Sequence, residues 1–224
     1  NMVCEFADVA LGKGVVEAKD TPGFLANRIG VYWLMVGLLD AIDMGISVEE
    51  ADAVMGKPVG IPKTGVFGLF DLIGIDLMPL IAKAMLDTLP ESDPFRQIYK
   101  EPDLVKQMIE DGYTGRKGKG GFYTMEKGEG GKRTKMAKDL KSGEYRAAAR
   151  PGLVYGSAAK GDLGKLISMK GKVGEYAWAV LGPTLSYSAS IVPEATATVV
   201  GVDDAMKLGY NWKFGPFEMI DKIG

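Results

Sequence analysis

The amino-acid sequence predicts a mainly α-helical protein built from two tandem helical units. Two apolar runs, at residues 24–39 and 171–200, are long enough for helices and too long for ordinary strands. A ten-residue motif at 65–74 returns at 215–224, with five identical positions at a constant offset of 150. Such a repeat indicates an internal duplication, in which each unit contains one of the long helices.

The composition is that of an ordinary globular protein. The chain has 224 residues, of which 46% are hydrophobic and 25% charged, so it can bury a sizeable core. The formal net charge of −2 argues against binding to nucleic acid or to an anionic membrane. The single cysteine, Cys4, excludes an internal disulfide framework and a multi-cysteine zinc site. A lone thiol also suits a reducing compartment, so we expect a cytoplasmic protein.

The absence of histidine restricts the chemistry that these residues can perform. Histidine is the commonest general acid or base near neutral pH and the commonest metal ligand. Because the sequence contains no histidine, neither a Ser-His-Asp nor a Cys-His arrangement can form. An ordinary site that mixes histidines with carboxylates is excluded as well, so we predict no bound metal.

The residues before the first long helix predict a short helix and a short strand. Residues 3–11 have a helical pattern, and the β-rich run at 15–19 is typical of a strand. A lone strand is not stable by itself. We therefore expect its sheet neighbours to lie upstream of residue 1.

The stretch from Asp20 to Ile29 predicts the start of the first long helix. Thr21 is suited to cap the helix and Pro22 to occupy its first position, where a missing amide costs nothing. Gly23 allows close approach of another surface. The run is shorter than the roughly 20 apolar residues of a membrane span, so we expect a core helix and no span.

Two adjacent polar residues interrupt this apolar run. Asn27 and Arg28 are the only charged or amide side chains between residues 24 and 39, so the helix is expected to be buried on most of its circumference. A buried amide or guanidinium without a partner is costly. Each must meet another protein group, a water molecule or a ligand, and a structural bond and a ligand contact both remain open.

The remainder of the first unit is predicted to form short helices joined by loops. Ser47 and Glu50 form a capping box that opens a helix ending near residues 55–56, and a loop rich in glycine and proline follows at 57–64. Further helical stretches are expected at residues 67–89 with kinks at Gly74 and Pro79, after Asp93, and at residues 102–109.

A basic, glycine-rich loop, G-Y-T-G-R-K-G-K-G-G-F-Y, occupies residues 112–123. It lacks the glycine and lysine spacing of a P-loop. Its composition favours a solvated turn, and a ligand contact is the alternative.

Residues 126–150 are charged and predict a linker between the units, with a helix at 132–141. Pro151–Gly152 marks a boundary, after which Asp162 is suited to cap a short helix. The second long apolar run is interrupted by Pro183 and Pro193.

The second unit is predicted to be a degenerate, structural copy of the first. Residues 48–51 match 202–205 at an offset of 154, so a loop four residues shorter would reconcile this match with the offset of 150. The only asparagine in the second unit is Asn211, in a later loop. The pair Asn27–Arg28 therefore has no counterpart there.

The segment D-T-P-G-F-L-A-N-R-I, preceded by G-K-G-V-V-E-A-K, resembles the junction between the nucleotide-binding and helical domains of the 3-hydroxyacyl-CoA dehydrogenases. The resemblance implies that Asn27 sits beside the catalytic histidine and contacts the hydroxyacyl group. The loop at 112–123 resembles the family's G-R/K-K-x-x-x-G-F-Y element, although it departs from the commoner T-G-x-G pattern. By that match Lys117 contacts NAD, whereas Arg116 and Lys119 are solvated or face CoA phosphates.

The resemblance implies a helical domain of the 6-phosphogluconate dehydrogenase-like type and NAD-dependent oxidation of a (3S)-3-hydroxyacyl-CoA. Tandem units of this kind imply a multifunctional fatty-acid β-oxidation enzyme. The family's His-Glu pair and G-x-G-x-x-G fingerprint are absent here. We therefore expect a fragment, cut at both ends and inactive alone. The alternative is a non-enzymatic helical module for oligomerisation or scaffolding, which a buried Asn27 would favour.

These expectations give a division of the chain into four parts and a prediction of self-association. The parts are residues 1–19, the tail of a missing nucleotide-binding domain; 20–125, the first helical unit; 126–150, the linker; and 151–224, the second unit. A homo-oligomer is expected because a missing domain would leave apolar surface on Phe24, Ile29, Tyr32 or Trp33.

Overall fold

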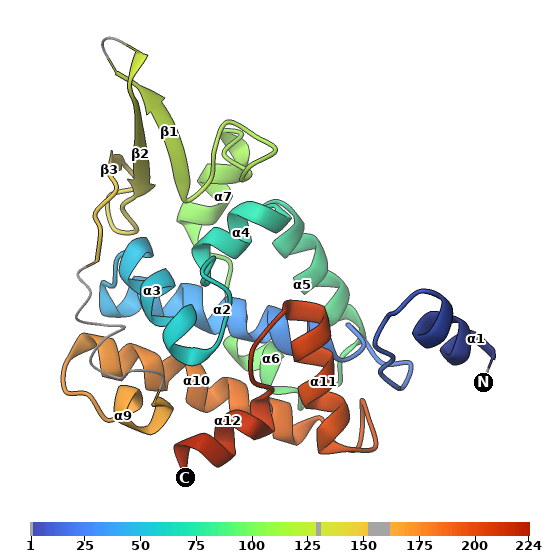
Figure 1. Cartoon of the computed structure of the whole chain (residues 1–224). Helices are drawn as coiled ribbons and strands as arrows, with labels where there is room; N and C mark the ends of the chain where they lie inside the picture. Colours follow the sequence, from blue (N-terminus) through green and yellow to red (C-terminus); the bar gives the residue numbers. More distant parts are fainter. Residues whose placement is uncertain (1, 129–130, 152–161) are drawn as a thin grey trace.

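A computed structural model describes residues 2–128, 131–151 and 162–224, and two long helices form its centre (Figure 1). These are α2 (Ala26–Met44) and α10 (Lys172–Ser190). Tyr32 stacks on Tyr187 with ring centroids 4.1 Å apart, and the Tyr176 hydroxyl donates to the Gly37 carbonyl at 2.8 Å. Contacts that run in opposite directions along the two helices show that they pack antiparallel.

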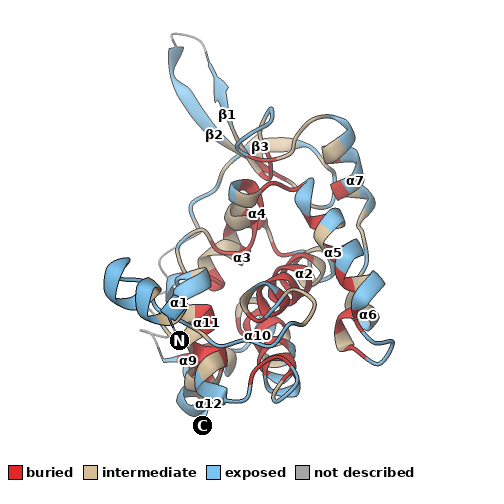
Figure 2. Cartoon of the chain, turned by 90° about the vertical axis from the view of Figure 1, so that its right-hand side faces the viewer, coloured by how far each residue is buried: buried red, intermediate tan, exposed pale blue. Residues whose placement is uncertain are grey.

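The other helices surround this pair, and the buried residues concentrate along α2 and α10 (Figure 2). The predicted fold class is confirmed, because the described residues are mainly helical and contain a small three-stranded sheet. The surrounding elements are α1 (Met2–Glu5), η1 (Phe6–Ala10), α3 (Val48–Val54), η2 (Lys57–Val59), α4 (Phe67–Ile73), α5 (Leu77–Thr88), α6 (Pro94–Ile98), α7 (Asp103–Glu110), α9 (Leu163–Ile167), α11 (Val199–Tyr210) and α12 (Pro216–Ile223).

Two of the predicted caps occur where the sequence placed them, since Ser47 and Glu50 form the capping box of α3 and Asp162 accepts a hydrogen bond at α9. Asp93, after which a helix was expected, accepts a hydrogen bond from the Phe95 amide of α6. The predicted helix at 67–89 is divided, because Gly74 has a φ of 109° that no helix tolerates. Gly152 of the predicted boundary Pro151–Gly152 lies outside the described residues.

The first long helix begins later than predicted. Its N-cap is Leu25, and neither Thr21 nor Pro22 belongs to it. Gly23 and Phe24 have φ values of 72° and 49°, which are left-handed and place residues 21–24 in a tight turn. Thr21 stabilises that turn by donating its hydroxyl to the Phe24 carbonyl at 3.2 Å. Gly23 is therefore needed for its backbone conformation, and its missing side chain also leaves room for the Arg28 backbone, which an added Cβ would meet at 3.2 Å.

The helix predicted at 132–141 is wrong. Here the chain forms an antiparallel meander of β1 (Tyr123–Lys127), β2 (Arg133–Lys138) and β3 (Tyr145–Ala147), in that order. β2 pairs with both neighbours, and the Lys135 ammonium lies 3.6 Å from the ring centroid of Tyr123 on β1. Pairing on both edges and this cross-strand contact select the strand over the helix.

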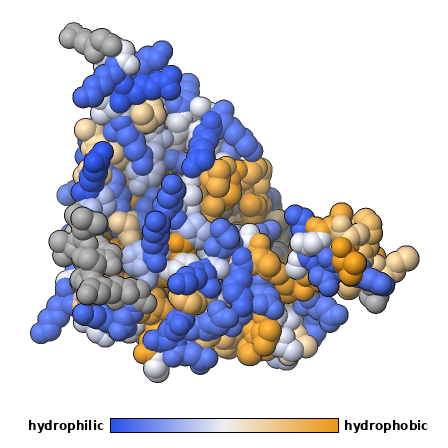
Figure 3. Space-filling view, viewed as in Figure 1, coloured by the Kyte–Doolittle hydropathy of each residue, from blue (hydrophilic) through white to orange (hydrophobic). Residues whose placement is uncertain are grey.

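The segment at 15–19, predicted to be a strand, runs as irregular chain and pairs with no described strand. It lies instead along the loop after α10. The Lys19 amide donates to the Ala195 carbonyl at 2.8 Å, and the Thr196 hydroxyl donates to the Glu17 carbonyl at 3.2 Å. Before it, α1 and η1 project away from the body and expose apolar side chains (Figures 1 and 3).

The duplication is present in the structure, but with a different alignment from the predicted one. Asp52 accepts hydrogen bonds from the first amides of α4, and Asp203 does so at α12. The N-caps Ser47 and Thr198 also correspond. Both pairs have an offset of 151, so the second unit's loop is one residue shorter rather than four. The predicted alignment of residues 48–51 with 202–205 was wrong because it did not align the two N-cap residues.

The second unit covers the apolar surface that was expected to bind another copy. Ile29, Tyr32 and Trp33 are buried, with Tyr32 stacked on Tyr187 and Trp33 in edge contact with Trp212. Of the four residues, only Phe24 is exposed, at 62%.

Candidate functional site

Asn27 lies in the first turn of α2, and its side chain is exposed. The hydroxyl of Tyr210, from the end of α11, donates to its side-chain carbonyl at 3.5 Å. Asn27 is thus open to a ligand on one side and in contact with the second unit on the other. The residue that the family resemblance selects therefore lies on an exposed face of α2, next to the second unit.

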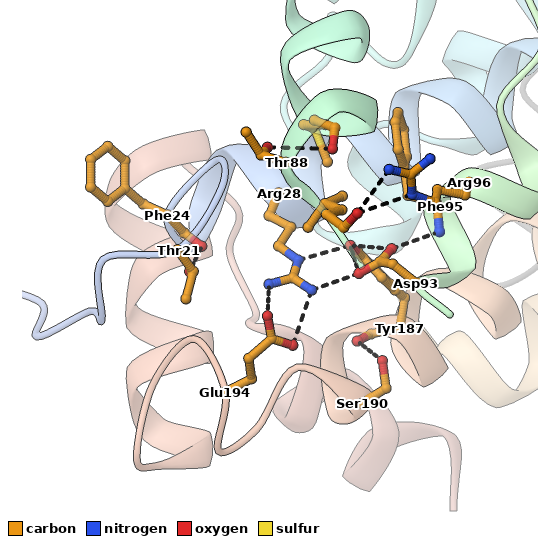
Figure 4. A network of polar contacts seen from close by, with 12 residues as sticks. Thr21, Phe24, Arg28, Thr88, Asp93, Phe95, Arg96, Tyr187, Ser190 and Glu194 are labelled. Atoms are coloured by element: carbon orange, nitrogen blue, oxygen red, sulfur yellow. Dashed lines mark hydrogen bonds and ion pairs between the residues drawn. The ribbon is translucent and has the colours of Figure 1, made fainter. Parts of the chain in front are cut away.

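Arg28 points the opposite way and is buried, with 1% of its surface exposed. Figure 4 shows its guanidinium among three partners. It is 2.6 Å from the Asp93 carboxylate and 2.8 Å from the Glu194 carboxylate, and its Nε donates to the Tyr187 hydroxyl at 2.9 Å. The partner that Arg28 needs is therefore a set of protein groups and not a ligand.

This network holds Arg28 ionised. Burial lowers the pKa of Arg28, but its hydrogen bonds to Glu194, Tyr187 and Asp93 outweigh burial and raise that pKa above its ordinary value. Burial raises the pKa of Tyr187, so its hydroxyl stays protonated; it accepts from Arg28 and donates to Asp93 at 3.2 Å.

The network also joins the two units next to Asn27. Arg28 and Asp93 belong to the first unit, whereas Tyr187 and Glu194 come from α10 and the loop after it. Asp93 additionally caps α6 through the Phe95 amide. The first turn of α2 is therefore held from inside, which fixes the backbone that presents Asn27 outward.

Lys117 lies in the glycine-rich loop between α7 and β1, and its side chain is exposed. Asp71 holds this loop, because its carboxylate accepts from the amides of Phe122 and Tyr123 and its carbonyl accepts from the Arg116 amide. A bridge between Gly115 and Gly120 closes the turn. The loop that was predicted to be a solvated turn or a ligand contact is therefore an anchored turn with exposed cations.

The side chains next to Lys117 have different surroundings. Arg116 is exposed, whereas the Lys119 amine donates to the Asp111 carbonyl at 2.8 Å. In Figure 1 this loop lies beside α7 and α4, while α2 begins at the other side of the molecule, near α11. The described residues thus place Lys117 and Asn27 in separate regions.

A polar cleft of about 550 Å³ lies between α3, α4 and the first two strands. Burial raises the pKa of Asp52 to about 8 and that of Asp71 to about 6, although hydrogen bonds to both carboxylates act in the other direction. Each oxygen of these carboxylates accepts at least one hydrogen bond from a backbone amide or from the Tyr123 hydroxyl. Both acids are therefore structural acceptors.

Four contributors to the Asn27 region were missed from sequence, namely Tyr210, Asp93, Tyr187 and Glu194. They lie 65 to 183 residues from the side chains that they contact, so no local spacing could indicate them. Within the described ranges no group of three or more His, Cys, Asp or Glu side chains could hold a metal. In the same part of the chain, no helix has the length and apolar character needed to cross a membrane.

Chemically, the arrangement around Asn27 can position an oxygen but cannot accept its proton. An amide N–H donates a hydrogen bond, whereas the protonated Tyr210 and the paired Arg28 cannot act as a base near neutral pH. Burial raises the pKa of Tyr210 to about 12. Neither of these two side chains therefore supplies a general base, and the sequence contains no histidine.

Comparisons with known proteins agree on one family. A family model described as 3-hydroxyacyl-CoA dehydrogenase, C-terminal domain, matches residues 23–125 and 176–224. The chain is 34% identical over 218 residues to the "Putative fatty acid oxidation complex trifunctional enzyme" of Rickettsia prowazekii, covering 97% of this chain and 29% of that protein. It is 36% identical over 225 residues to the "Probable 3-hydroxyacyl-CoA dehydrogenase" of Bacillus subtilis, covering 98% and 28%.

The chain therefore spans less than a third of the length of these two curated relatives. Its fold is similar to the crystal structure of 3-hydroxybutyryl-CoA dehydrogenase from Escherichia coli K12, with a TM-score of 0.65. That match covers 100% of this chain and 57% of the other at 18% identity, so it shows the fold alone.

Proposed function

We propose, from the premise that this chain belongs to the family of 3-hydroxyacyl-CoA dehydrogenase C-terminal domains, that it is the substrate-side part of an NAD-dependent (3S)-3-hydroxyacyl-CoA dehydrogenase. The exposed Asn27 carries this proposal, because it lies on a turn that the Arg28 network holds in place. Its amide N–H would donate to the oxygen of the hydroxyacyl group and hold it for reaction.

When bound, NAD accepts a hydride from the hydroxyl-bearing carbon of the substrate. The residues of this chain contribute orientation. Asn27 would stabilise the oxygen as it becomes a carbonyl, while the proton goes to a base on a nucleotide-binding domain. Lys117 fits a single contact to the cofactor, since its amine is exposed on an anchored loop. By themselves the 224 residues would be inactive.

The proposal includes a location and partners. The partner molecule is an acyl-CoA and the compartment is the cytoplasm. The whole protein is a multifunctional fatty-acid β-oxidation enzyme, and the names of the relatives support this last part. It also includes self-association into a homo-oligomer. The alternative, a non-enzymatic oligomerisation or scaffolding module, would be favoured by a buried Asn27, and this side chain is exposed.

Substitution of Asn27 by alanine in the complete dehydrogenase tests the proposal. Asn27→Ala should lower kcat by one to two orders of magnitude with a smaller effect on NAD affinity, because one hydrogen bond to an oxygen gaining charge is worth roughly 1.5–3 kcal/mol. NADH absorbance with a 3-hydroxyacyl-CoA gives kcat, and a thermal melt gives Tm.

Stability should change little, since the Asn27 side chain is exposed. A variant that melts several degrees lower but keeps its kcat would remove Asn27 from the site and defeat the proposal. Gln107→Ala is a matched control, because it removes an exposed side-chain amide that belongs to α7 and not to α2.

A further inference from the structure

We propose that Tyr210 of the second unit is a positioning residue that orients the Asn27 amide for the dehydrogenase reaction; this inference rests on the function proposed above. The second unit would then supply part of the working site, whereas its sequence suggests a purely structural copy. The observation behind it is the hydroxyl of Tyr210, which donates to the side-chain carbonyl of Asn27 at 3.5 Å.

The contact determines which end of the Asn27 amide faces outward. Burial raises the pKa of Tyr210 to about 12, so its hydroxyl stays protonated and can donate at neutral pH. In the structure the Asn27 carbonyl oxygen is the atom that faces this hydroxyl and accepts from it. With the carbonyl turned to Tyr210, the NH₂ group turns to the exposed side, where it can donate to a substrate oxygen.

The helix surface is shaped for this tyrosine. A Cβ added at Gly30 would lie 2.0 Å from Tyr210 Cζ and 2.2 Å from its oxygen, so the ring packs directly on the α2 backbone. Gly30 is one turn after Ala26 and is buried. Glycine at this position costs helix stability relative to alanine, and the space that it leaves is filled by Tyr210.

At 3.5 Å the Tyr210–Asn27 bond is long for a hydroxyl donor. Bonds in catalytic sites often shorten only when substrate is bound. Its effect should therefore be seen in kcat more than in the stability of the free enzyme.

Tyr210→Phe in the complete dehydrogenase removes the hydroxyl and keeps the ring. We expect kcat to fall about 5- to 10-fold with KM for the acyl-CoA changed less than 2-fold, because an unpaired amide rotates between two orientations. Tm should stay within about 2 °C of the parent. The matched control is Tyr99→Phe, which removes a half-buried hydroxyl at the C-terminal end of α6 and should keep kcat.

The double variant Asn27→Ala/Tyr210→Phe tests the coupling. If Tyr210 acts through Asn27, the double variant should be no slower than Asn27→Ala alone. Independent losses that multiply would overturn the inference. So would a Tyr210→Phe enzyme whose Tm falls while kcat is unchanged, since that result identifies a structural hydroxyl.

Gly30→Ala provides a second, independent variant that retains the Tyr210 hydroxyl but displaces the ring. It should reduce kcat as much as Tyr210→Phe does, whereas Gly182→Ala in α10, where the nearest atom to the added Cβ is 3.3 Å away, should not. The two proposals fail differently. A normal kcat for Asn27→Ala defeats the proposed function, while a reduced kcat for Asn27→Ala with normal values for Tyr210→Phe and Gly30→Ala defeats this inference alone.

Discussion

Arg28 is the residue whose burial most constrains the structure around α2. A guanidinium can be removed from water only when its donors are satisfied, and here two carboxylates and a tyrosine hydroxyl accept four hydrogen bonds from its three nitrogens. Asp93 is as deeply buried as Arg28, while Glu194 is half-exposed. Within the network, substitution of Arg28 or Asp93 should therefore lower the stability of the fold most.

Arg28→Met should destabilise the protein by about 3–5 kcal/mol, because it leaves the buried Asp93 carboxylate without its cation. For a chain of this size the expected drop in Tm is about 6–20 °C, measured by calorimetry or circular dichroism. Glu194→Gln, at the exposed end of the network, should cost less than half as much.

Removal of both buried charges offers the decisive comparison. Arg28→Met/Asp93→Leu should be more stable than Arg28→Met, since no unpaired charge remains inside. If Arg28→Met alone lowers the stability by less than about 1 kcal/mol, the network is not the joint between the units.

Among the elements, the meander β1–β2–β3 is attached to the first unit by hydrogen bonds from Tyr123 and by an ion pair. Arg146 on β3 donates to both oxygens of Glu49 on α3, at 2.6 and 2.8 Å, and the Ala149 amide donates to the same carboxylate at 2.7 Å. Burial raises the pKa of Glu49, but these bonds outweigh burial and hold the pKa below its ordinary value.

A lowered pKa has a defined effect on stability. The folded protein binds a proton at Glu49 less readily than the unfolded chain does, so the pair stabilises the fold above the ordinary pKa and loses this contribution as the pH falls through the folded pKa. Glu49→Gln should therefore cost about 1.5–3 kcal/mol at pH 7 and much less near pH 3.

Thermal melts from pH 7 to pH 3 measure this difference. Glu110→Gln, an exposed carboxylate on α7, is the control and should follow the parent at every pH. A Glu49→Gln deficit that is equal at pH 7 and pH 3 would show that charge plays no part in attaching the meander.

The elements also show which features a sequence can predict. The caps at Ser47, Asp93 and Asp162 depend on residues two or three positions away, so they could be recognised. β2 could not, because its lysines, methionine and alanine are good helix formers and become a strand only by pairing on both sides.

The same limit applies to the site. Asn27 could be selected through its motif, but the Tyr210 hydroxyl that reaches it lies 183 residues away, and Glu194 lies 166 residues from Arg28. Contacts between residues so far apart along the chain leave no periodic pattern in the sequence. The left-handed turn at Phe24 was missed for a different reason, since a phenylalanine rarely adopts a positive φ.

At the scale of the whole molecule, self-association was expected on four residues of which three are buried, and we now predict that the apolar segment preceding residue 12 promotes it instead. Phe6 and Val9 are 59% and 78% exposed on a helical segment that is too short to be stable by itself. A second copy presents the same side chains, so pairing of these segments would cover them.

We expect light scattering to give a dimer or a larger species at micromolar concentration. Phe6→Ser/Val9→Ser should shift the chain to a monomer, whereas Leu80→Ser, at an exposed apolar position on α5, should not. A parent chain that is monomeric across the micromolar range would contradict this prediction.

The packing of two duplicated units within one chain, through α2 and α10, has one more consequence. In a symmetric homodimer every substitution appears twice, so both copies of a surface must serve the same purpose. Two units on one chain are not bound by that constraint, because a substitution in one unit leaves the sequence of the other unchanged. Tyr210 corresponds by its offset of 151 to Val59, a fully buried residue of the first unit, and Asn27 has no asparagine opposite it. The duplication thus permits an asymmetric division of labour, in which one half presents an amide and the other half orients it.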